Sequence, residues 1–479
     1  MARSLLWFRQ DLRLTDNSAL EAVIDRGEPI CATYILDNEN LRELGGASRW
    51  WLHHSLAALQ ADLTKLGGRL NLFQGDSHHI VSQLCAREDL DSLHLNRCYE
   101  PEAAALEQRI CKSVQSTVEV HRYSGTLLFE PELIVKDDGS PYRVFTPFYK
   151  SCLRRPSPGR RAKQASDGSW CLEPLPGACT LEQLALLPTK PDWAGGLRER
   201  WQPGEQGARQ KLEAFLESAV AGYKTDRDVP AIDGTSQVSP HLHFGEISPK
   251  IIWYQVERAA AQTPEFQQGA TAFLRELVWR DFAYYLLHHW PTLPKAPFRP
   301  EFVNFPWLDD AKLREVWSKG QTGYPLVDAG MRQLWHTGWM HNRVRMVVAS
   351  FLVKHCLQHW RHGEAWFWDT LVDADLANNT ASWQWAAGCG ADAAPYFRIF
   401  NPTLQSQKFD SRGDYIRQYV PELAALPARY IHEPSKAPTQ VLEEASVELG
   451  VNYPHPIVEH KMARERALAA HKSMPKNSG

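Results

Sequence analysis

The sequence predicts an α/β N-terminal domain, built on a doubly wound, Rossmann-like parallel sheet, followed by a large all-α C-terminal domain. Short β-rich runs alternate with helix-length segments over the first 130 residues. Helical periodicity dominates from about residue 205 onward. Only three of the 18 tryptophans precede residue 150, which also separates the two parts. We therefore predict domains at 1–130 and 205–479, joined by a connector at 131–204.

The first domain follows from strands and helices that alternate along the chain. A strand, a helix and a second strand in this order form a βαβ unit, and repeated units build a parallel sheet. Neither a G-x-G-x-x-G nor a G-x-x-x-x-G-K-[ST] motif is present, so a dinucleotide fingerprint and a P-loop are not expected. The predicted strands are 5–8, 31–36, 70–73, 93–96 and 118–123, and the predicted helices are 17–26, 48–66, 77–87 and 102–114.

The segment 131–204 is rich in proline and loses the regular pattern, which predicts a long connector over the surface. Basic residues outnumber acidic ones between Lys136 and Lys163. Either a solvated loop or a basic rim that faces a polyanion explains this composition. Beyond the connector, apolar residues recur at helical spacing and predict helices at 205–221, 266–289, 311–319, 327–337, 340–359 and 364–370.

Composition excludes several functional classes. The formal charge is −3, so any binding to nucleic acid must come from a local patch. The nine cysteines contain no C-x-x-C pair, which argues against structural zinc, an iron–sulfur cluster or a disulfide framework. We expect no bound metal, no signal peptide and no membrane span, and a reduced, cytoplasmic compartment.

Three groups of polar residues in the helical part could carry chemistry. The segment 234–240 brings hydroxyls to a helix start, with Ser239 as the expected N-cap, and is either a phosphate cradle or an ordinary capped turn. Glu276 and Trp279 share a helix face, and Arg280 follows them. Together they could bind a base and a phosphate. Alternatively, Trp279 is a core residue and the two charged residues form an ion pair on the surface. Asn342 and Met346 share another face.

The segment 373–385 is the densest of these groups. Asp373 and Asp375 suggest a metal site, but the segment offers few further oxygen ligands. Alternatively, one aspartate pairs with an arginine such as Arg345. Trp383 and Trp385 add two redox-capable indoles beside the carboxylates.

Taken together, these segments resemble the photolyase/cryptochrome family, and within it the bacterial enzymes that repair cyclobutane pyrimidine dimers. The similarity covers nearly the whole chain. It is carried by the motifs at 6–13, 322–329, 337–343, 373–385 and 396–402.

The resemblance implies an FAD in the helical domain. Asn379 would face N5 of the flavin, and Arg345 would pair with Asp373. The residues that would hold FAD are Tyr223, Thr235, Ser236, Gln237, Val238, Ser239, Arg345, Asp373, Ala374, Asp375 and Asn379.

The resemblance also implies how damaged DNA is bound, as a single strand or a duplex. A flipped-out dimer would lie between Trp279 and Trp385, with Glu276 hydrogen-bonded to it as a catalytic residue. Trp383, Trp360 and Trp307 would form an electron relay that recharges the flavin. The further DNA-binding residues would be Arg227, Arg280, Asn342, Arg343, Met346, Arg398 and Gln405.

Two relatives within the same fold remain as alternatives, together with a metal-dependent nuclease built on Asp373 and Asp375. A cryptochrome would signal through partners instead of repairing DNA. An enzyme for (6-4) photoproducts would have two histidines at the positions of Asn342 and Met346. For the antenna chromophore we expect 5,10-methenyltetrahydrofolate, near Tyr99, Glu100 and Lys295, with 8-hydroxy-5-deazaflavin as the alternative. We expect a monomer without an obligate protein partner.

Overall fold

The computed structural model describes residues 3–87, 89–163, 168–393 and 397–474. Tyr396, the first residue of the motif at 396–402, lies outside them. The chain divides into two compact units, Met1–Ala221 with Ser236–Pro291, and Gly222–Thr235 with Thr292–Gly479. The predicted domain boundaries, 1–130, 131–204 and 205–479, stay a prediction. The two compact units are distinguished by their internal contacts, and this does not test where functional domains begin and end. No helix within the described residues is long and apolar enough to cross a membrane.

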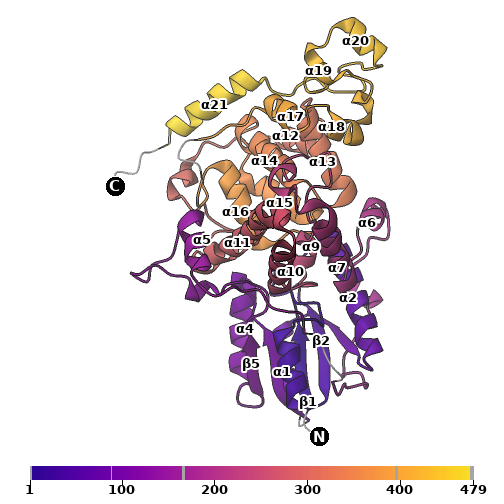
Figure 1. Ribbon diagram of the computed structural model, residues 1–479, viewed down its shortest axis with the longest axis vertical. Coiled ribbons are helices and arrows are strands. Elements are labelled where there is room, and N and C mark those ends of the chain that lie inside the picture. The colour runs from indigo at the N-terminus through magenta and orange to yellow at the C-terminus, as the bar shows by residue number, and fades with distance from the viewer. Residues whose placement is uncertain (1–2, 88, 164–167, 394–396, 475–479) are drawn as a thin grey trace. The chain divides into compact units, whose positions relative to one another are not determined.

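The first unit contains a five-stranded parallel sheet in the order β3-β2-β1-β4-β5 (Figure 1). This order reverses direction at β1, as expected for a doubly wound sheet. Every predicted strand is present within three residues of its predicted limits. The strands are β1 (Arg3–Phe8), β2 (Ile30–Leu36), β3 (Leu70–Gln74), β4 (Leu90–Asn96) and β5 (Glu119–Tyr123).

Four helices link the strands, and one face of the sheet forms a hydrophobic core with two of them. Leu5 and Leu93 point from β1 and β4 into this core, where they meet Val81 of α3 and Ile110 of α4. Pro101 begins α4, where the fixed φ of proline fits the first helical turn. The predicted fold class is confirmed. The helices are α1 (Ser18–Arg26), α2 (Gly46–Lys65), α3 (Ser77–Cys85) and α4 (Pro101–Val114).

The connector is partly built into the first unit. Trp170 bridges to Ile30 of β2, and Cys179 bridges to Leu72 of β3. Between these bridges Cys171 is buried in the core of the sheet. A segment without regular periodicity therefore still supplies apolar residues to a core formed by other parts of the chain.

The helices beyond the sheet are distributed over both units. The first unit contains α5 (Phe145–Leu153), α6 (Gly195–Arg200), α7 (Glu205–Ala214), α9 (Ser239–His243), α10 (Pro249–Gln262) and α11 (Gln267–His289). The second contains α8 (Tyr223–Asp226), α12 (Ala311–Ser318), α13 (Pro325–Thr337), α14 (Asn342–Ser350), α15 (Trp360–Thr370), α16 (Leu376–Ala387), α17 (Pro402–Phe409), α18 (Asp414–Tyr419), α19 (Ala428–Ile431), α20 (Thr439–Glu444) and α21 (His460–Lys472).

The predicted helix at 340–359 is wrong in its second half. α14 ends at Ser350 and passes into a π-helical turn, Phe351–His355. Leu357 then has a φ of 51°, a left-handed conformation that a continuous α-helix cannot contain. A new helix, α15, starts at Trp360, where the side chain of His359 caps it by accepting from the backbone N–H of Arg361. The predicted helix at 364–370 therefore begins four residues earlier.

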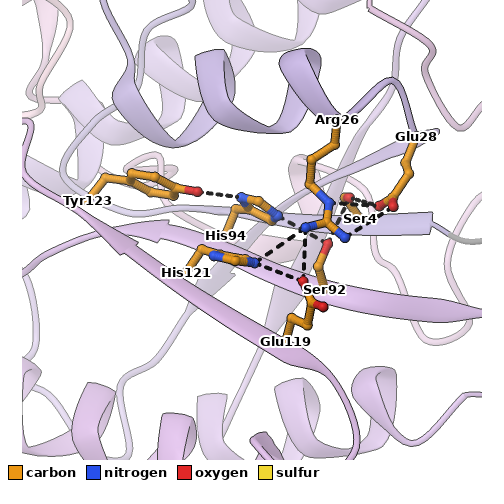
Figure 2. A network of polar contacts seen from close by, with 8 residues as sticks. All are labelled: Ser4, Arg26, Glu28, Ser92, His94, Glu119, His121 and Tyr123. Atoms are coloured by element: carbon orange, nitrogen blue, oxygen red, sulfur yellow. Dashed lines mark hydrogen bonds and ion pairs between the residues drawn. The ribbon is translucent and has the colours of Figure 1, made fainter.

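The opposite face of the sheet contains a polar network between α1 and the strands β1, β4 and β5 (Figure 2). Ser4 and Ser92 hydrogen-bond through their hydroxyls at 2.8 Å, and Nε2 of His94 lies 3.1 Å from Ser92 Oγ. Nδ1 of His94 lies 3.1 Å from the hydroxyl of Tyr123. Arg26 completes the network from the end of α1, through ion pairs to Glu28 and Glu119.

We expect stability to fall as the pH decreases from about 6.5 to about 4, because burial lowers the pKa of His94 to about 4, assisted by the nearby charges of His121 and Arg26. The unfolded chain binds a proton in this range that the folded chain does not bind, so acid favours unfolding. One such proton gives a slope of up to about 1.4 kcal/mol per pH unit. Urea unfolding at several pH values measures this slope. His94→Gln should flatten the slope, whereas replacement of the exposed His79 by glutamine should leave it unchanged.

Candidate functional site

The helices α15 and α16 of the second unit pack closely and position the largest group of predicted site residues. Asp375 caps α16, because its Oδ1 accepts from the backbone N–H of Asn378 at 2.7 Å. Asn379 and Trp383, four residues apart, therefore lie on one face of the helix. Gly363 of α15 lies against the ring of Trp383, so closely that a Cβ there would be 2.0 Å from Trp383 Cη2. The absence of a side chain at Gly363 permits this contact.

Arg345 and Asp373 form an ion pair, as predicted. Arg345 Nη2 lies 3.0 Å from Asp373 Oδ2, and the aspartate side chain is only 6% exposed. Arg345 also donates through Nε to the carbonyl of Met340 at 2.7 Å. The backbone before α14 thereby fixes the guanidinium, and Asp373 neutralises its charge. Ala374, which follows Asp373, is buried.

Asn379 is buried and its side-chain amide has a defined orientation. Nδ2 donates to the backbone carbonyl of Glu364 at 3.0 Å and to its Oε1 at 3.1 Å. The carbonyl oxygen of the amide consequently points away from Glu364. Sequence reasoning did not identify Glu364, because it lies 15 residues from Asn379 on another helix.

The three predicted relay tryptophans all lie in the second unit. Trp383 and Trp360 are each 2% exposed, and Trp307 is half-buried. The ring of His359 lies between the outer two, with its centroid 5.6 Å from that of Trp360 and 5.3 Å from that of Trp307. Burial lowers the pKa of His359 to about 4, so this ring is neutral at ordinary pH. No local pattern indicated a histidine between the two indoles.

The predicted cofactor turn spans the boundary between the two units. In the second unit, Tyr223 begins α8 and Arg227 lies over its ring at 5.3 Å, while Thr235 is half-buried. Gly234 lies so close to the backbone of Asp226 that a Cβ would be 2.6 Å from its carbonyl oxygen. This close approach excludes a larger residue at position 234.

In the first unit, Ser236, Gln237 and Val238 are buried and lead into α9. Gln237 has a φ of 53° and accepts from Lys211 Nζ at 3.0 Å. The prediction that Ser239 is the N-cap is wrong, because Val238 takes that place and Ser239 is the first, exposed residue of the helix.

The predicted substrate residues of the first unit lie on α11. The ring of Trp279 stacks on Phe145 of α5, with centroids 3.6 Å apart and planes 9° apart. Arg280 donates to the backbone carbonyl of Thr126 at 2.9 Å, and Glu276 lies one turn before it on the same helix. Phe145 was not predicted, since it lies in the connector, but it fixes the plane of the indole.

The remaining predicted DNA-binding residues lie in the second unit. Arg343 pairs with Asp228 at 2.7 Å, and its Nη1 lies 3.8 Å from the sulfur of Met346. Asn342 begins α14 and is exposed, and Gln405 of α17 is half-buried. Trp385 and Arg398 line one cavity. The structure thus brings together Arg343 with Met346, and Trp385 with Arg398.

Comparison with known proteins assigns both parts of the chain. Residues 4–166 match the family model of DNA photolyase, and residues 273–473 match that of the FAD binding domain of DNA photolyase. A deoxyribodipyrimidine photo-lyase of Agrobacterium fabrum is 47% identical over 475 residues, which cover 99% of this chain and 98% of that protein. Cryptochrome-2 of Arabidopsis thaliana is 37% identical, over 97% of this chain and 78% of that protein.

A solved structure shows the same architecture. A bacterial class III photolyase from Agrobacterium tumefaciens superimposes with a TM-score of 0.94 at 47% identity, over 99% of this chain and 98% of that one. Identity at this level over nearly the full length of both chains establishes common descent and not fold alone. The chain belongs to the DNA photolyase family, and carries the FAD-binding domain of that family.

Proposed function

We propose that the protein repairs cyclobutane pyrimidine dimers in DNA, with FAD as cofactor and blue light as energy source. The observation that carries this proposal is the 47% identity to a deoxyribodipyrimidine photo-lyase across the whole chain. A cryptochrome function is the second candidate, because Cryptochrome-2 of Arabidopsis thaliana is 37% identical.

Asn342 and Met346 favour cyclobutane dimers over (6-4) photoproducts. Both positions lie on α14, next to Arg343. The family members that repair (6-4) photoproducts carry two histidines there, and histidine is the side chain that transfers protons most readily near neutral pH. An amide and a thioether have no titratable proton near neutral pH.

The buried polar groups of the second unit fit a flavin that must stay electron-rich. FAD, when bound in its reduced form, supplies the light-excited electron that splits the dimer. Glu364 holds Nδ2 of Asn379, so the amide would present its carbonyl oxygen, an acceptor, to the cofactor. The paired Arg345 and Asp373 offer both a donor and an acceptor without adding net charge. Tyr223, Thr235, Asp375 and the turn 236–239 would complete the binding site.

The dimer would be bound by stacking and by one carboxylate. A damaged base pair stacks poorly, so flipping it out of the duplex costs less than flipping intact bases. Trp279 is held rigid by Phe145 and would stack on the dimer, with Trp385 as the second aromatic surface. Glu276 would accept a hydrogen bond from it. Phosphates would be bound by Arg227, Arg280, Arg343 and Arg398, with Gln405 beside them.

The relay would carry an electron inward from the surface to the cofactor site. Trp307 is the half-buried end, and Trp360 and Trp383 are the buried members. The neutral ring of His359 bridges the gap between Trp307 and Trp360. An imidazolium at this place would repel the positive charge that each tryptophan carries in turn.

For the antenna we propose 5,10-methenyltetrahydrofolate, with 8-hydroxy-5-deazaflavin as the alternative. Tyr99 lies three residues beyond the end of β4, and its hydroxyl donates to Glu130 at 2.8 Å. Binding at Glu100 and Lys295 is part of the same proposal.

We further propose a monomer that acts in the cytoplasm on single- or double-stranded DNA.

The decisive experiment uses the reduced holoenzyme and an oligonucleotide with one thymine dimer. We expect thymines to be restored under blue light and not in the dark. Flavin binding without repair would favour the cryptochrome, and the same assay with a (6-4) photoproduct would follow. A purified protein without flavin would contradict the proposal.

Trp279→Ala should weaken binding of the damaged oligonucleotide about 5- to 150-fold, because stacking on an aromatic ring contributes about 1–3 kcal/mol per base. A fluorescence titration in the dark measures this affinity. Trp335→Ala removes an indole that is 60% exposed and lies outside the predicted site, and serves as the control. Equal affinities for both variants would exclude the stacking role of Trp279.

A further inference from the structure

The second unit contains a cavity of about 60 Å³ next to the end of α16. A water molecule needs about 10–15 Å³ of such space, so the cavity has room for about four to six groups of that size. Its walls combine three cationic side chains, one hydroxyl and aromatic rings. The lining residues include Arg299, Ser350, Lys354, Trp385, Phe397 and Arg398.

Lys354 lies in the wall of this cavity and is only 5% exposed. Its ammonium donates to the backbone carbonyl of Arg398 and lies 4.6 Å from the centroid of the Phe397 ring. Burial lowers the pKa of Lys354 to about 7, assisted by the positive charge of the Arg398 guanidinium. No carboxylate among the described residues forms an ion pair with Lys354, although buried ammonium groups usually have one.

Two guanidinium groups add to the positive charge around the cavity. Arg299 pairs with Glu301 at 2.7 Å, and also donates to the backbone carbonyl of Gly388 at 3.2 Å. Arg398 is exposed. With Lys354 protonated, three cationic side chains line the cavity, and their charge favours an anion there.

Ser350 provides an independent indication of a ligand. The residue is 2% exposed, and its Oγ has no hydrogen-bond partner among the residues that the structure describes. A buried hydroxyl without a partner is destabilising. Since Ser350 lines the cavity, its hydroxyl can donate to a group bound there.

We propose that this cavity binds a phosphate group, with Lys354, Arg299 and Arg398 as cationic partners and the hydroxyl of Ser350 as a neutral donor. A phosphate has five heavy atoms, which matches the size of the cavity, and its oxygens accept from all four donors. The phosphate belongs either to the DNA strand or to a free anion or nucleotide. Only the DNA source rests on the proposed function, in which Trp385 and Arg398 contact the strand.

The first arm of the test measures binding of inorganic phosphate to the holoenzyme by calorimetry, in the dark, against chloride at equal ionic strength. Lys354→Met should weaken this binding about tenfold or more, because a hydrogen bond to a charged group contributes about 1.5–3 kcal/mol. Ser350→Ala, a smaller change, should weaken it about two- to tenfold. Lys312→Met, at an exposed position of the same unit, should not change it.

The second arm measures binding of undamaged single-stranded DNA as a function of salt. If the phosphate belongs to DNA, Lys354→Met reduces the slope of log Kd against log salt by about 0.7, the value for one lost contact. An unchanged slope with weaker phosphate binding assigns the cavity to a free anion. Unchanged binding in both arms for Lys354→Met and Ser350→Ala would overturn the proposal. Neither arm uses light or a lesion, so a failure of dimer repair would be seen separately.

Discussion

Gly363→Ala should lower the free energy of unfolding by about 3 kcal/mol and slow the photoreduction of the bound flavin. The added methyl group would lie 2.0 Å, 2.3 Å and 2.5 Å from three carbons of the Trp383 ring. Contacts this short cannot persist, so the indole or one of the two helices must move. Because Trp383 is one of the two buried members of the proposed relay, its displacement also changes electron transfer.

The surroundings of Trp383 leave the ring little freedom to move. It is 2% exposed, and Phe367 packs edge to face against it at a centroid distance of 4.9 Å. Trp317 lies on a further side at 6.2 Å. An interior packed at this density transmits the strain of an added group to its neighbours. Thermal unfolding of the holoenzyme and the rate of flavin reduction under blue light measure the two effects.

A matched control and a rescue distinguish this steric effect from a general cost of losing glycine. Gly195 starts α6, and a methyl group added there would have nothing within 4 Å, so Gly195→Ala should be neutral or slightly stabilising. Adding Trp383→Phe to Gly363→Ala removes the clashing ring and should recover part of the lost stability. If Gly363→Ala alone were as stable as Gly195→Ala, the close packing of α15 on α16 would be refuted.

Asp373→Asn should lower the affinity for FAD at least tenfold and the stability of the holoenzyme by about 3 kcal/mol. The substitution leaves Arg345 charged beside a neutral amide, and breaking a buried ion pair costs about 3–5 kcal/mol. Arg345 is 25% exposed, so water screens part of this cost and the lower value applies. The ratio of flavin to protein after gel filtration and the midpoint of thermal unfolding measure the two quantities.

A double variant separates the structural role of the pair from its role toward the cofactor. Arg345→Met with Asp373→Leu removes both charges and should restore much of the stability, because apolar residues replace a buried ion pair at little cost. Flavin affinity should stay low. Arg412→Met breaks a pair whose side chains are 82% and 44% exposed, and should change neither quantity appreciably. Full flavin retention in the double variant would contradict the proposed role of the pair.

Much of the first unit could be predicted from local patterns. The strands of the sheet alternate apolar and polar residues or are apolar throughout, and Pro101 marks the start of α4. Such signals lie within a few residues of the element that they specify. The break at Leu357 and the early start of α15 could not be predicted. The apolar pattern of the sequence continues unchanged through the π-helical turn and the left-handed residue.

The residues of the candidate site could be predicted only where the sequence resembles motifs of the photolyase/cryptochrome family. Arg345 and Asp373 were expected to pair, and they do. Glu364, His359 and Phe145 were not identified, although each contacts a predicted residue. No local pattern indicates a role for any of the three. Their importance comes from the neighbour that another part of the chain brings to them.

By itself, the sequence determined the order of strands and helices, the family and the residue types available for chemistry. Periodicity reports which face of an element is buried, and this is a property of neighbouring residues. Only the tertiary structure decided what that face meets: that Trp383 lies against Gly363, that Asn379 is oriented by Glu364, and that Lys354 and Ser350 share a cavity. These contacts join residues far apart in the chain, and side-chain packing, which no local pattern records, selects them.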